Sequence, residues 1–372
     1  MYQQIAYIVI AFCLSAVCGI ITIPQVIRFC NKKKLYDEPS IRKIHKTSIP
    51  RLGGICFLPS MLLAFLAATA FYNNSLVGKQ LQFSLWSIYF FVSLLLIYSA
   101  GIIDDLIGIG AKTKFSFQII AAVLLPMAGL FINDLYGICG IHELHYIIGA
   151  PLTVFIIVFI VNAINLIDGI DGLSASISFI ALAGFLFIFM QADMRAYSIL
   201  IAGLMGVLVP FFYFNLWGDE RKNHKIFMGD SGSLTLGFIL GFLMIKVMMK
   251  NPAVVQFSDT LVILAYSLLI VPTFDVIRVS TVRLIHKRPI FLADKNHIHH
   301  KLLRTGLNQH QTLLTIIIIS LLFIAVNMIL ASFTLSIIII SDILIWLLCQ
   351  MIINKAILRN GKSVFVNASE NK

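Results

Sequence analysis

Long apolar segments alternate with short polar ones along almost the whole chain. An apolar run of about 18 residues is long enough to cross a bilayer as a helix. On this basis the pattern predicts about eleven membrane spans, near residues 5–28, 53–73, 83–103, 115–132, 147–164, 173–191, 196–214, 231–249, 259–280, 312–332 and 334–354. The expected fold class is all-α, a polytopic integral membrane protein. One transmembrane domain would cover residues 1–354, and a cytoplasmic tail, frayed towards its end, would cover 355–372.

The basic residues favour one side of this arrangement. Lys and Arg concentrate in every second connection, at residues 28–51, 110–114, 219–225, 278–304 and 355–362. Because basic loops are retained in the cytoplasm, this alternation predicts an outside N-terminus and an inside C-terminus.

The composition supports the membrane assignment and argues against a nucleic-acid partner. The chain of 372 residues is 59% hydrophobic and only 12% charged, whereas a soluble protein carries roughly 25% charged residues. Its net charge of +11 fits retained cytoplasmic loops, and no motif for nucleic acid accompanies it, so no nucleic-acid partner is expected. The six cysteines are scattered without a C-x-x-C pair, which indicates neither a disulfide framework nor a zinc knuckle.

Polar residues that could carry chemistry gather on the predicted inner face. They occur in five stretches, RKIHKTSIPRLGG (42–54), GIIDDLIGIGAKTKF (101–115), NLIDGIDGLS (165–174), FNLWGDERKNHKIFMGDSGSLTLGF (214–238) and VIRVSTVRLIHKRPIFLADKNHIHHKLL (276–303). An ionisable residue at membrane depth is a candidate for function. The one-sided collection therefore suggests a site that faces the cytoplasm.

Each stretch also has a structural interpretation, which the sequence leaves open. Asp104 and Asp105 could be solvated at a helix end, although two carboxylates there oppose the helix dipole unless a cation accompanies them. Asp230 or Ser231 could simply cap a span that begins at Leu234.

The last stretch allows three interpretations. Its HIHH motif could be a pH-sensitive cluster, part of a zinc site, or a set of hydrogen-bond donors to an anionic ligand. The neighbouring Lys301 and Arg304 favour the anion. The cations at 278, 283, 287 and 288, like RKIHK, could instead bind anionic membrane lipids.

Several Asp and Asn residues together with clustered cations suit a magnesium–diphosphate substrate. Mg²⁺ prefers oxygen ligands, and phosphoryl transfer depends mainly on positioning and charge neutralisation. An apolar bundle around such a site would suit a substrate whose other end is a lipid.

The motifs also carry a family resemblance. IPRLGG, DD followed by AKTKF, NAINLIDGIDGL, FMGDSGSL and DKNHIHH, in this order, resemble the polyprenyl-phosphate N-acetylhexosamine-1-phosphate transferases over residues 40–303. The resemblance implies transfer of a sugar 1-phosphate from a UDP-N-acetylhexosamine to undecaprenyl phosphate, with release of UMP. It further implies Mg²⁺ as cofactor, with Mn²⁺ as a substitute, and a site on the cytoplasmic face of the bacterial inner membrane. The oligomeric state stays open, a homodimer included.

The resemblance assigns roles to individual residues. It implies that Asp104 and Asp105 are the catalytic pair at the acceptor phosphate, and that Asn165 and Asp230 hold the magnesium ion. The implied substrate contacts are Lys114 at the phosphates, Asp168 and Asp171 in the nucleotide turn, Phe227 stacked on uracil, and His297, His299 and His300 near the sugar and diphosphate.

Further details of the motifs indicate which branch of this transferase family the chain resembles. RKIHKTSIPRLGG resembles the branch that uses UDP-GlcNAc or a related UDP-sugar, which primes O-antigen, enterobacterial common antigen or teichoic acid. Gly108 stands where members of the family often have a third acidic residue after the DD pair, and Asn215 is a candidate uridine contact.

Two other functions compete with an enzyme. A secondary transporter of an anionic sugar or lipid would place its charged groups near the midplane on broken helices, whereas here they lie at loop edges. A structural subunit of an envelope complex would not need aspartates in three separate loops. Both alternatives are therefore less favoured than a transferase.

Overall fold

A computed structural model of the protein describes residues 2–37, 49–75, 85–219, 224–250, 257–289 and 295–366, and helices dominate these ranges. The helices are α1 (Tyr2–Lys33), η1 (Gly53–Cys56), α2 (Phe57–Ser75), α3 (Leu85–Ile107), α4 (Ala111–Met127), α5 (Tyr146–Ile167), α6 (Leu173–Gln191), α7 (Arg195–Leu216), α8 (Gly229–Met248), α9 (Asp259–Ser267), α10 (Ile270–Ile285), α11 (Ile298–Arg304), α12 (Gln309–Ile329) and α13 (Leu335–Arg359). Two short antiparallel pairs accompany them, β1 (Tyr36–Asp37) with β2 (Ile49–Pro50) and β3 (Asp134–Ile138) with β4 (Ile141–Glu143).

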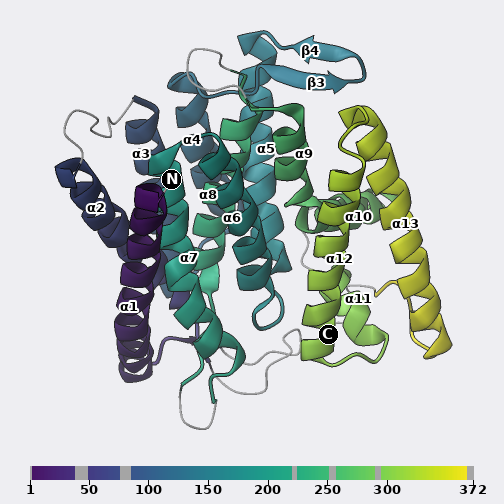
Figure 1. Ribbon diagram of the computed structural model, residues 1–372. Coiled ribbons are helices and arrows are strands. Elements are labelled where there is room, and N and C mark those ends of the chain that lie inside the picture. The colour runs from purple at the N-terminus through teal and green to yellow at the C-terminus, as the bar shows by residue number, and fades with distance from the viewer. Residues whose placement is uncertain are drawn as a thin grey trace.

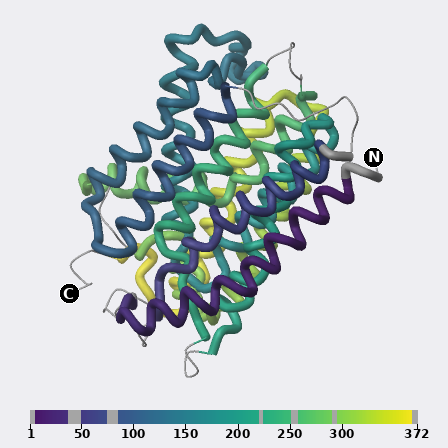
Figure 2. The backbone as a smooth tube through the Cα atoms, turned by 90° about the vertical axis from the view of Figure 1, so that its left-hand side faces the viewer, coloured from purple at the N-terminus to yellow at the C-terminus, as the bar shows by residue number. Residues whose placement is uncertain are grey.

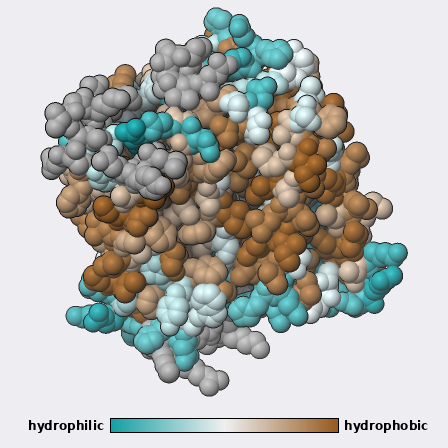
Figure 3. Space-filling view, in the orientation of Figure 1, coloured by the Kyte–Doolittle hydropathy of each residue, from teal (hydrophilic) through white to brown (hydrophobic). Residues whose placement is uncertain are grey.

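The long helices run side by side as one bundle (Figure 1). Its surface carries a broad hydrophobic band between two hydrophilic ends (Figure 3). Nine helices of the described ranges are long and apolar enough to cross a membrane. The expectation of an all-α, multi-pass membrane protein is confirmed.

The number of spans differs slightly from the expected eleven. The span expected at 259–280 is a bent pair, because α9 and α10 meet at an angle of 58°, as in a broken span or a re-entrant loop. The span expected at 115–132 corresponds to α4, which has only 17 residues. A helix of this length lies at the lower limit for crossing a bilayer.

Helix α8 occupies the centre of the bundle and is buried along its length. It packs against α3, α5, α6 and α9. Aromatic rings fill the interface with α3, where Phe90 stacks on Phe242 with ring centroids 4.0 Å apart. Because α8 is enclosed, its first turn is fixed by several other elements, and the candidate site is built around that turn.

The two ends of the bundle differ in character. At the end that we call the basic end, α1 finishes with Lys32 and Lys33, α10 has Arg283 in its last turn and α13 has Arg359 in its last turn. The β3–β4 hairpin lies at the opposite end, where the chain also starts (Figures 1 and 2). The start of α1 and the end of α13 lie at opposite ends of the bundle, as the alternating basic loops predicted.

Two features correct the expectations. A β-hairpin occupies residues 134–143, where only a sparse loop was expected. Helix α13 runs to Arg359, beyond the predicted end of the last span at residue 354, and the residues after it contact α11 instead of being frayed. The tail therefore begins later than expected, and its first part belongs to the fold.

Candidate active site

The start of α8 is held by the segment that contains IPRLGG. The backbone N–H groups of Gly53 and Gly54 donate to the carbonyls of Phe227 and Met228 at 2.9 and 2.8 Å. A Cβ atom on Gly54 would lie 2.0 Å from the backbone nitrogen of Gly232, so only glycine permits this approach. The glycines of the motif therefore fix the position of the first turn of α8.

Asp105 caps α8 from a neighbouring helix. Its carboxylate oxygens accept hydrogen bonds from the backbone N–H groups of Asp230 and Ser231 at 2.8 and 2.9 Å, and the residue is 4% exposed. Negative charge at a helix N-terminus is stabilising. The sequence predicted a cap by Asp230 or Ser231 themselves for a span that begins at Leu234. That prediction is wrong, because α8 begins at Gly229 and neither side chain supplies the cap.

A charged cluster lies at the mouth of this turn. The ammonium group of Lys114 bridges Asp104, at 2.9 Å, and Asp230. The side-chain amide of Asn165 donates to Asp230 at 2.9 Å and to Ser233 at 2.8 Å. The structure thus brings together side chains from α3, α4, α5 and α8 that the sequence placed in one site. Ser233 was not predicted, although it shares the FMGDSGS motif.

The donor set of this cluster fits a magnesium ion. Mg²⁺ takes oxygen ligands, usually one or two carboxylates with the remaining positions filled by phosphate and water. Asp230 and Asn165 supply a carboxylate and an amide oxygen on facing helices, and the ammonium of Lys114 already shows where positive charge is favoured. The described residues contain no group of three His, Cys, Asp or Glu side chains that could hold a metal by themselves. A cation here would therefore depend on a substrate for further ligands.

The NLIDGIDGLS segment forms a tight turn between α5 and α6. Gly172 has φ +74°, a conformation that favours glycine. Its N–H donates to the side chain of Asn215 at 2.6 Å, and Asn215 donates in turn to the carbonyl of Ile226. Asn215, the candidate uridine contact, thus has a structural function in tying the turn to the segment before α8. An ion pair between Asp171 and Lys225, at 2.8 Å, joins the same turn to the same segment.

Asp168, at the start of this turn, has no cationic partner of this kind among the described residues. Burial raises the pKa of its carboxyl to about 8, and the negative charges of Asp230, Asp171 and Asp105 contribute to the rise. A carboxyl that is repelled by its neighbours is a common sign of a functional site. This part of the site favours an added positive charge or a protonated Asp168.

A buried aspartate that was not predicted from the sequence organises the histidine motif. Asp275 on α10 is 1% exposed and accepts hydrogen bonds from Arg278 at 2.7 Å, from the ring Nδ1 of His297 at 2.8 Å and from the backbone N–H of Ile298 at 3.0 Å. Asp275 was hidden inside an apolar run, but an acidic residue in a span was a usable signal. Arg278 faces this network, which argues against the lipid contact considered for it.

His299 contacts the nucleotide turn. A Cβ atom on Gly169 would lie 2.1 Å from the Nε2 atom of His299, so the ring packs directly against the turn. Burial lowers the pKa of His299, and the neighbouring His300 and His297 lower it further. Both ring nitrogens of His299 are buried, and neither has a hydrogen-bond partner in the described part of the chain.

The structure gives no support to a zinc site in the HIHH motif. The Nδ1 atom of His297 is taken by Asp275, and no three metal-ligating side chains converge among the residues described. The ring of His300 lies 4.2 Å from that of His299, centroid to centroid. The motif is therefore better suited to hydrogen bonding than to metal binding.

Phe227 and Gly108, two other positions that the sequence singled out, lie at the ends of α8 and α3. Phe227, expected on the uracil ring, is half-buried just before α8, and its backbone is hydrogen-bonded to Pro50 and Gly53. Gly108, with φ +71°, follows α3, and a Cβ atom added there would meet nothing within 4 Å. Residues 42–48, which include RKIHK, residues 220–223 and residues 290–294 lie outside the described ranges.

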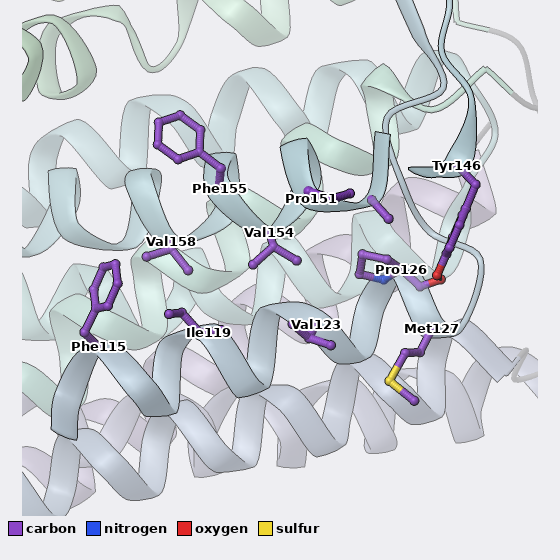
Figure 4. Close-up of a pocket in the computed structure, with 11 residues that line it drawn as sticks. Phe115, Ile119, Val123, Pro126, Met127, Tyr146, Pro151, Val154, Phe155 and Val158 are labelled. Carbon is purple, nitrogen blue, oxygen red and sulfur yellow. The ribbon is translucent and has the colours of Figure 1, made fainter. Parts of the chain in front are cut away.

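An apolar groove lies between α4 and α5, beside the charged cluster. It has a volume of about 510 Å³ and is lined on one side by Phe115, Ile119 and Val123 and on the other by Val154 and Val158 (Figure 4). Tyr146 and Met127 lie at its far end, towards the β3–β4 hairpin. The groove therefore follows the length of α4 from the cluster across the hydrophobic band.

Comparisons with known proteins identify relatives of the chain. A profile of the glycosyl transferase family 4 matches residues 87–248. A probable undecaprenyl-phosphate N-acetylglucosaminyl 1-phosphate transferase of Bacillus subtilis (strain 168) is 32% identical over 327 residues, which cover 86% of this chain and 84% of the relative. Undecaprenyl-phosphate alpha-N-acetylglucosaminyl 1-phosphate transferases of Yersinia pestis and Escherichia coli (strain K12) are 26% and 25% identical, over 76% and 78% of this chain and 73% and 74% of their own lengths.

Proposed function

Because the chain belongs to glycosyl transferase family 4, we propose that it transfers N-acetylhexosamine 1-phosphate, with GlcNAc 1-phosphate as the expected group, from a UDP-sugar to undecaprenyl phosphate. The products would be undecaprenyl-diphosphate-sugar and UMP. The relatives are bacterial, and their names give this activity and this acceptor. The basic end would face the cytoplasm at the inner membrane, in agreement with the retention of basic loops on that side.

One observation carries the proposal. Lys114, which bridges the two aspartates of the cluster, is followed on α4 by Phe115, the first residue of the apolar groove. A charged site suited to phosphate therefore opens directly onto a groove suited to a hydrocarbon chain. This combination fits an acceptor with a phosphate head and a polyprenyl tail.

The residues of the cluster would act mainly through charge and position. Lys114 would neutralise the acceptor phosphate as it approaches, and Asp104, which holds Lys114, would orient it. A magnesium ion held by Asp230 and Asn165 would supply charge neutralisation at the donor diphosphate. Because a phosphate monoester is largely ionised near pH 7, with a second pKa of about 6, removal of a proton from it contributes little.

The donor would lie on the other side of the first turn of α8. The histidine motif meets the nucleotide turn at 168–172 there, because His299 touches Gly169, and Phe227 lies just before α8. The backbone can approach a nucleotide closely at glycine. His297 and His299 would donate or accept hydrogen bonds at the sugar and diphosphate.

A defined assay tests the proposal. The purified protein, incubated with Mg²⁺, undecaprenyl phosphate and a panel of UDP-sugars, is expected to release UMP and to form a lipid-linked sugar with UDP-GlcNAc or a close analogue. Failure to transfer from every UDP-sugar of the panel, with the protein folded, would exclude the proposed activity.

The groove can be tested separately with a matched pair on α4. Val123→Trp fills the groove, whereas Ile120→Trp places the same ring at an exposed position of the same helix that does not line the groove. Val123→Trp is expected to raise the KM for undecaprenyl phosphate and to leave the KM for the UDP-sugar unchanged. Equal effects of the two substitutions would count against the groove as the site of the lipid tail.

A further inference from the structure

We propose that the segment that follows α13, residues 360–366, is a strap that positions the histidine motif. We call it the C-terminal strap, and we call residues 295–300 the histidine loop. The effect on catalysis rests on the proposed function, whereas the positioning itself does not.

The strap pairs with the residue directly before His297. The side-chain oxygen of Asn296 accepts from the backbone N–H of Val366 at 3.1 Å, and its amide donates to the carbonyl of the same residue at 3.2 Å. This two-point pairing satisfies both polar groups of one strap residue, as a neighbouring strand would. The backbone carbonyl of Asn296 also accepts a hydrogen bond from Arg278. The histidine loop is thus held by α10 and by the strap together.

An aromatic residue of the strap packs against the end of α10. The ring of Phe365 stacks on His286, with centroids 4.7 Å apart and an angle of 7° between the planes. The guanidinium group of Arg288 lies 4.9 Å from the centre of the same ring. Contacts of a cation with an aromatic face contribute stability even at partly exposed sites. Phe365 therefore anchors the strap to the basic end.

Two more hydrogen bonds fix the far end of the motif. Arg304 donates to the carbonyl of Val364 at 3.3 Å, and the side chain of Asn360 donates to the carbonyl of Thr305. Helix α11, which contains His299 and His300, has only seven residues. A helix this short is not stable by itself. Its position therefore depends on outside contacts, and the strap supplies contacts on both sides of it.

Three variants of the protein test the role of the strap. The first ends after Gly361 and lacks most of the strap, the second ends after Val366 and is the matched control, and the third is the full chain with Phe365→Leu. Hydrogen exchange over residues 295–304 is measured together with kcat and KM for both substrates. Loss of the strap is expected to speed exchange in this region and to lower kcat/KM for the UDP-sugar about tenfold or more, a factor that corresponds to two lost hydrogen bonds. The chain that ends after Val366 should match the full chain, and the KM for undecaprenyl phosphate should not change.

A double variant and a rescue separate positioning from general stability. Asn296→Ala in the chain that ends after Gly361 should add little to the truncation, because both changes remove the same pairing. A synthetic peptide of residues 360–372, added to the truncated protein, should restore part of the donor kcat/KM.

If hydrogen exchange over residues 295–304 is unchanged in the chain that ends after Gly361, the strap does not position the histidine loop. This result would hold whether or not the protein proves to be a transferase. A rise in activity on truncation would also overturn it, since it would indicate that the segment inhibits the site. If the full chain transfers no sugar phosphate at all, the proposed function fails, and the exchange measurement still decides the positioning.

Discussion

Asp105→Asn separates a structural from a direct catalytic role of the paired aspartates. The structure assigns the two residues different partners, because Asp105 accepts from the backbone of α8 whereas Asp104 accepts from Lys114 and from the backbone N–H of Ile109. We therefore expect Asp105→Asn to lower both stability and activity, and Asp104→Asn to lower activity with little effect on stability.

The size of the stability effect follows from the cap. An asparagine at position 105 can accept one of the two backbone N–H groups, but its own amide then faces the other. A buried donor without an acceptor costs about 1–3 kcal/mol, and loss of the charge at the N-terminus of α8 adds roughly 0.5–1 kcal/mol. The free energy of unfolding should therefore fall by about 2–4 kcal/mol. Asp104 is partly exposed, and loss of such an ion pair costs about 0.2–1 kcal/mol.

The measurement compares the two variants in one detergent. Unfolding free energies come from titration of mixed micelles with a denaturing detergent, and initial rates of UMP release come from the folded fractions. Both variants are expected to lose roughly a hundredfold or more in turnover, the scale of a lost electrostatic clamp or positioned base. An Asp105→Asn protein as stable as the parent, yet inactive, would refute the cap as the main role of this residue and indicate contact with substrate.

Three further outcomes can be checked with the same preparations. Asp230→Asn should abolish transfer while the protein stays folded, and chelation of divalent ions should stop the parent enzyme until Mg²⁺ is restored. Near-normal turnover of the variant at ordinary Mg²⁺ would contradict the assignment of Asp230 as a magnesium ligand. Gly169→Ala should lower activity by displacing His299, whereas Gly110→Ala, where a Cβ atom meets nothing within 4 Å, should behave as the parent in the same rate assay. Lys301→Met should stabilise the protein more at pH 7 than at pH 10, because burial and then Arg278 lower the pKa of Lys301 to about 7. Between these pH values the unfolded chain binds more protons than the folded one, so the cost of burying the lysine disappears as the pH rises. A stability difference that does not depend on pH would contradict this.

The sequence predicts the fold class and the composition of the site because both depend on local patterns. Apolar length determines the spans, and motifs such as FMGDSGS and NLIDGIDGLS identify segments that meet in the fold. What the sequence could not supply is the pairing between segments. The cap of α8 comes from Asp105, which lies on α3, and no spacing along the chain connects the two.

Two other omissions have the same physical origin. Asp275 was overlooked because its surroundings are apolar in sequence, while its partners His297 and Arg278 become neighbours only when α10 and the histidine loop pack together. Most of the strap was expected to fray because it belongs to the tail of the chain. Its order comes from side chains elsewhere, mainly Asn296 and Arg304, that satisfy its backbone groups.

The charges of the candidate site are not evenly compensated. Several charged side chains of the site have a partner of opposite charge, as in the pairs Asp104–Lys114, Asp171–Lys225 and Asp275–Arg278. For Asp168 no ion pair is found among the described residues, and burial together with nearby carboxylates raises its pKa to about 8. Ionisation of Asp168 would therefore leave an excess of negative charge at the nucleotide turn, next to Asn165 and Asp230. A divalent cation that arrives with the donor diphosphate would relieve this excess, so donor and metal should bind more tightly together than either does alone.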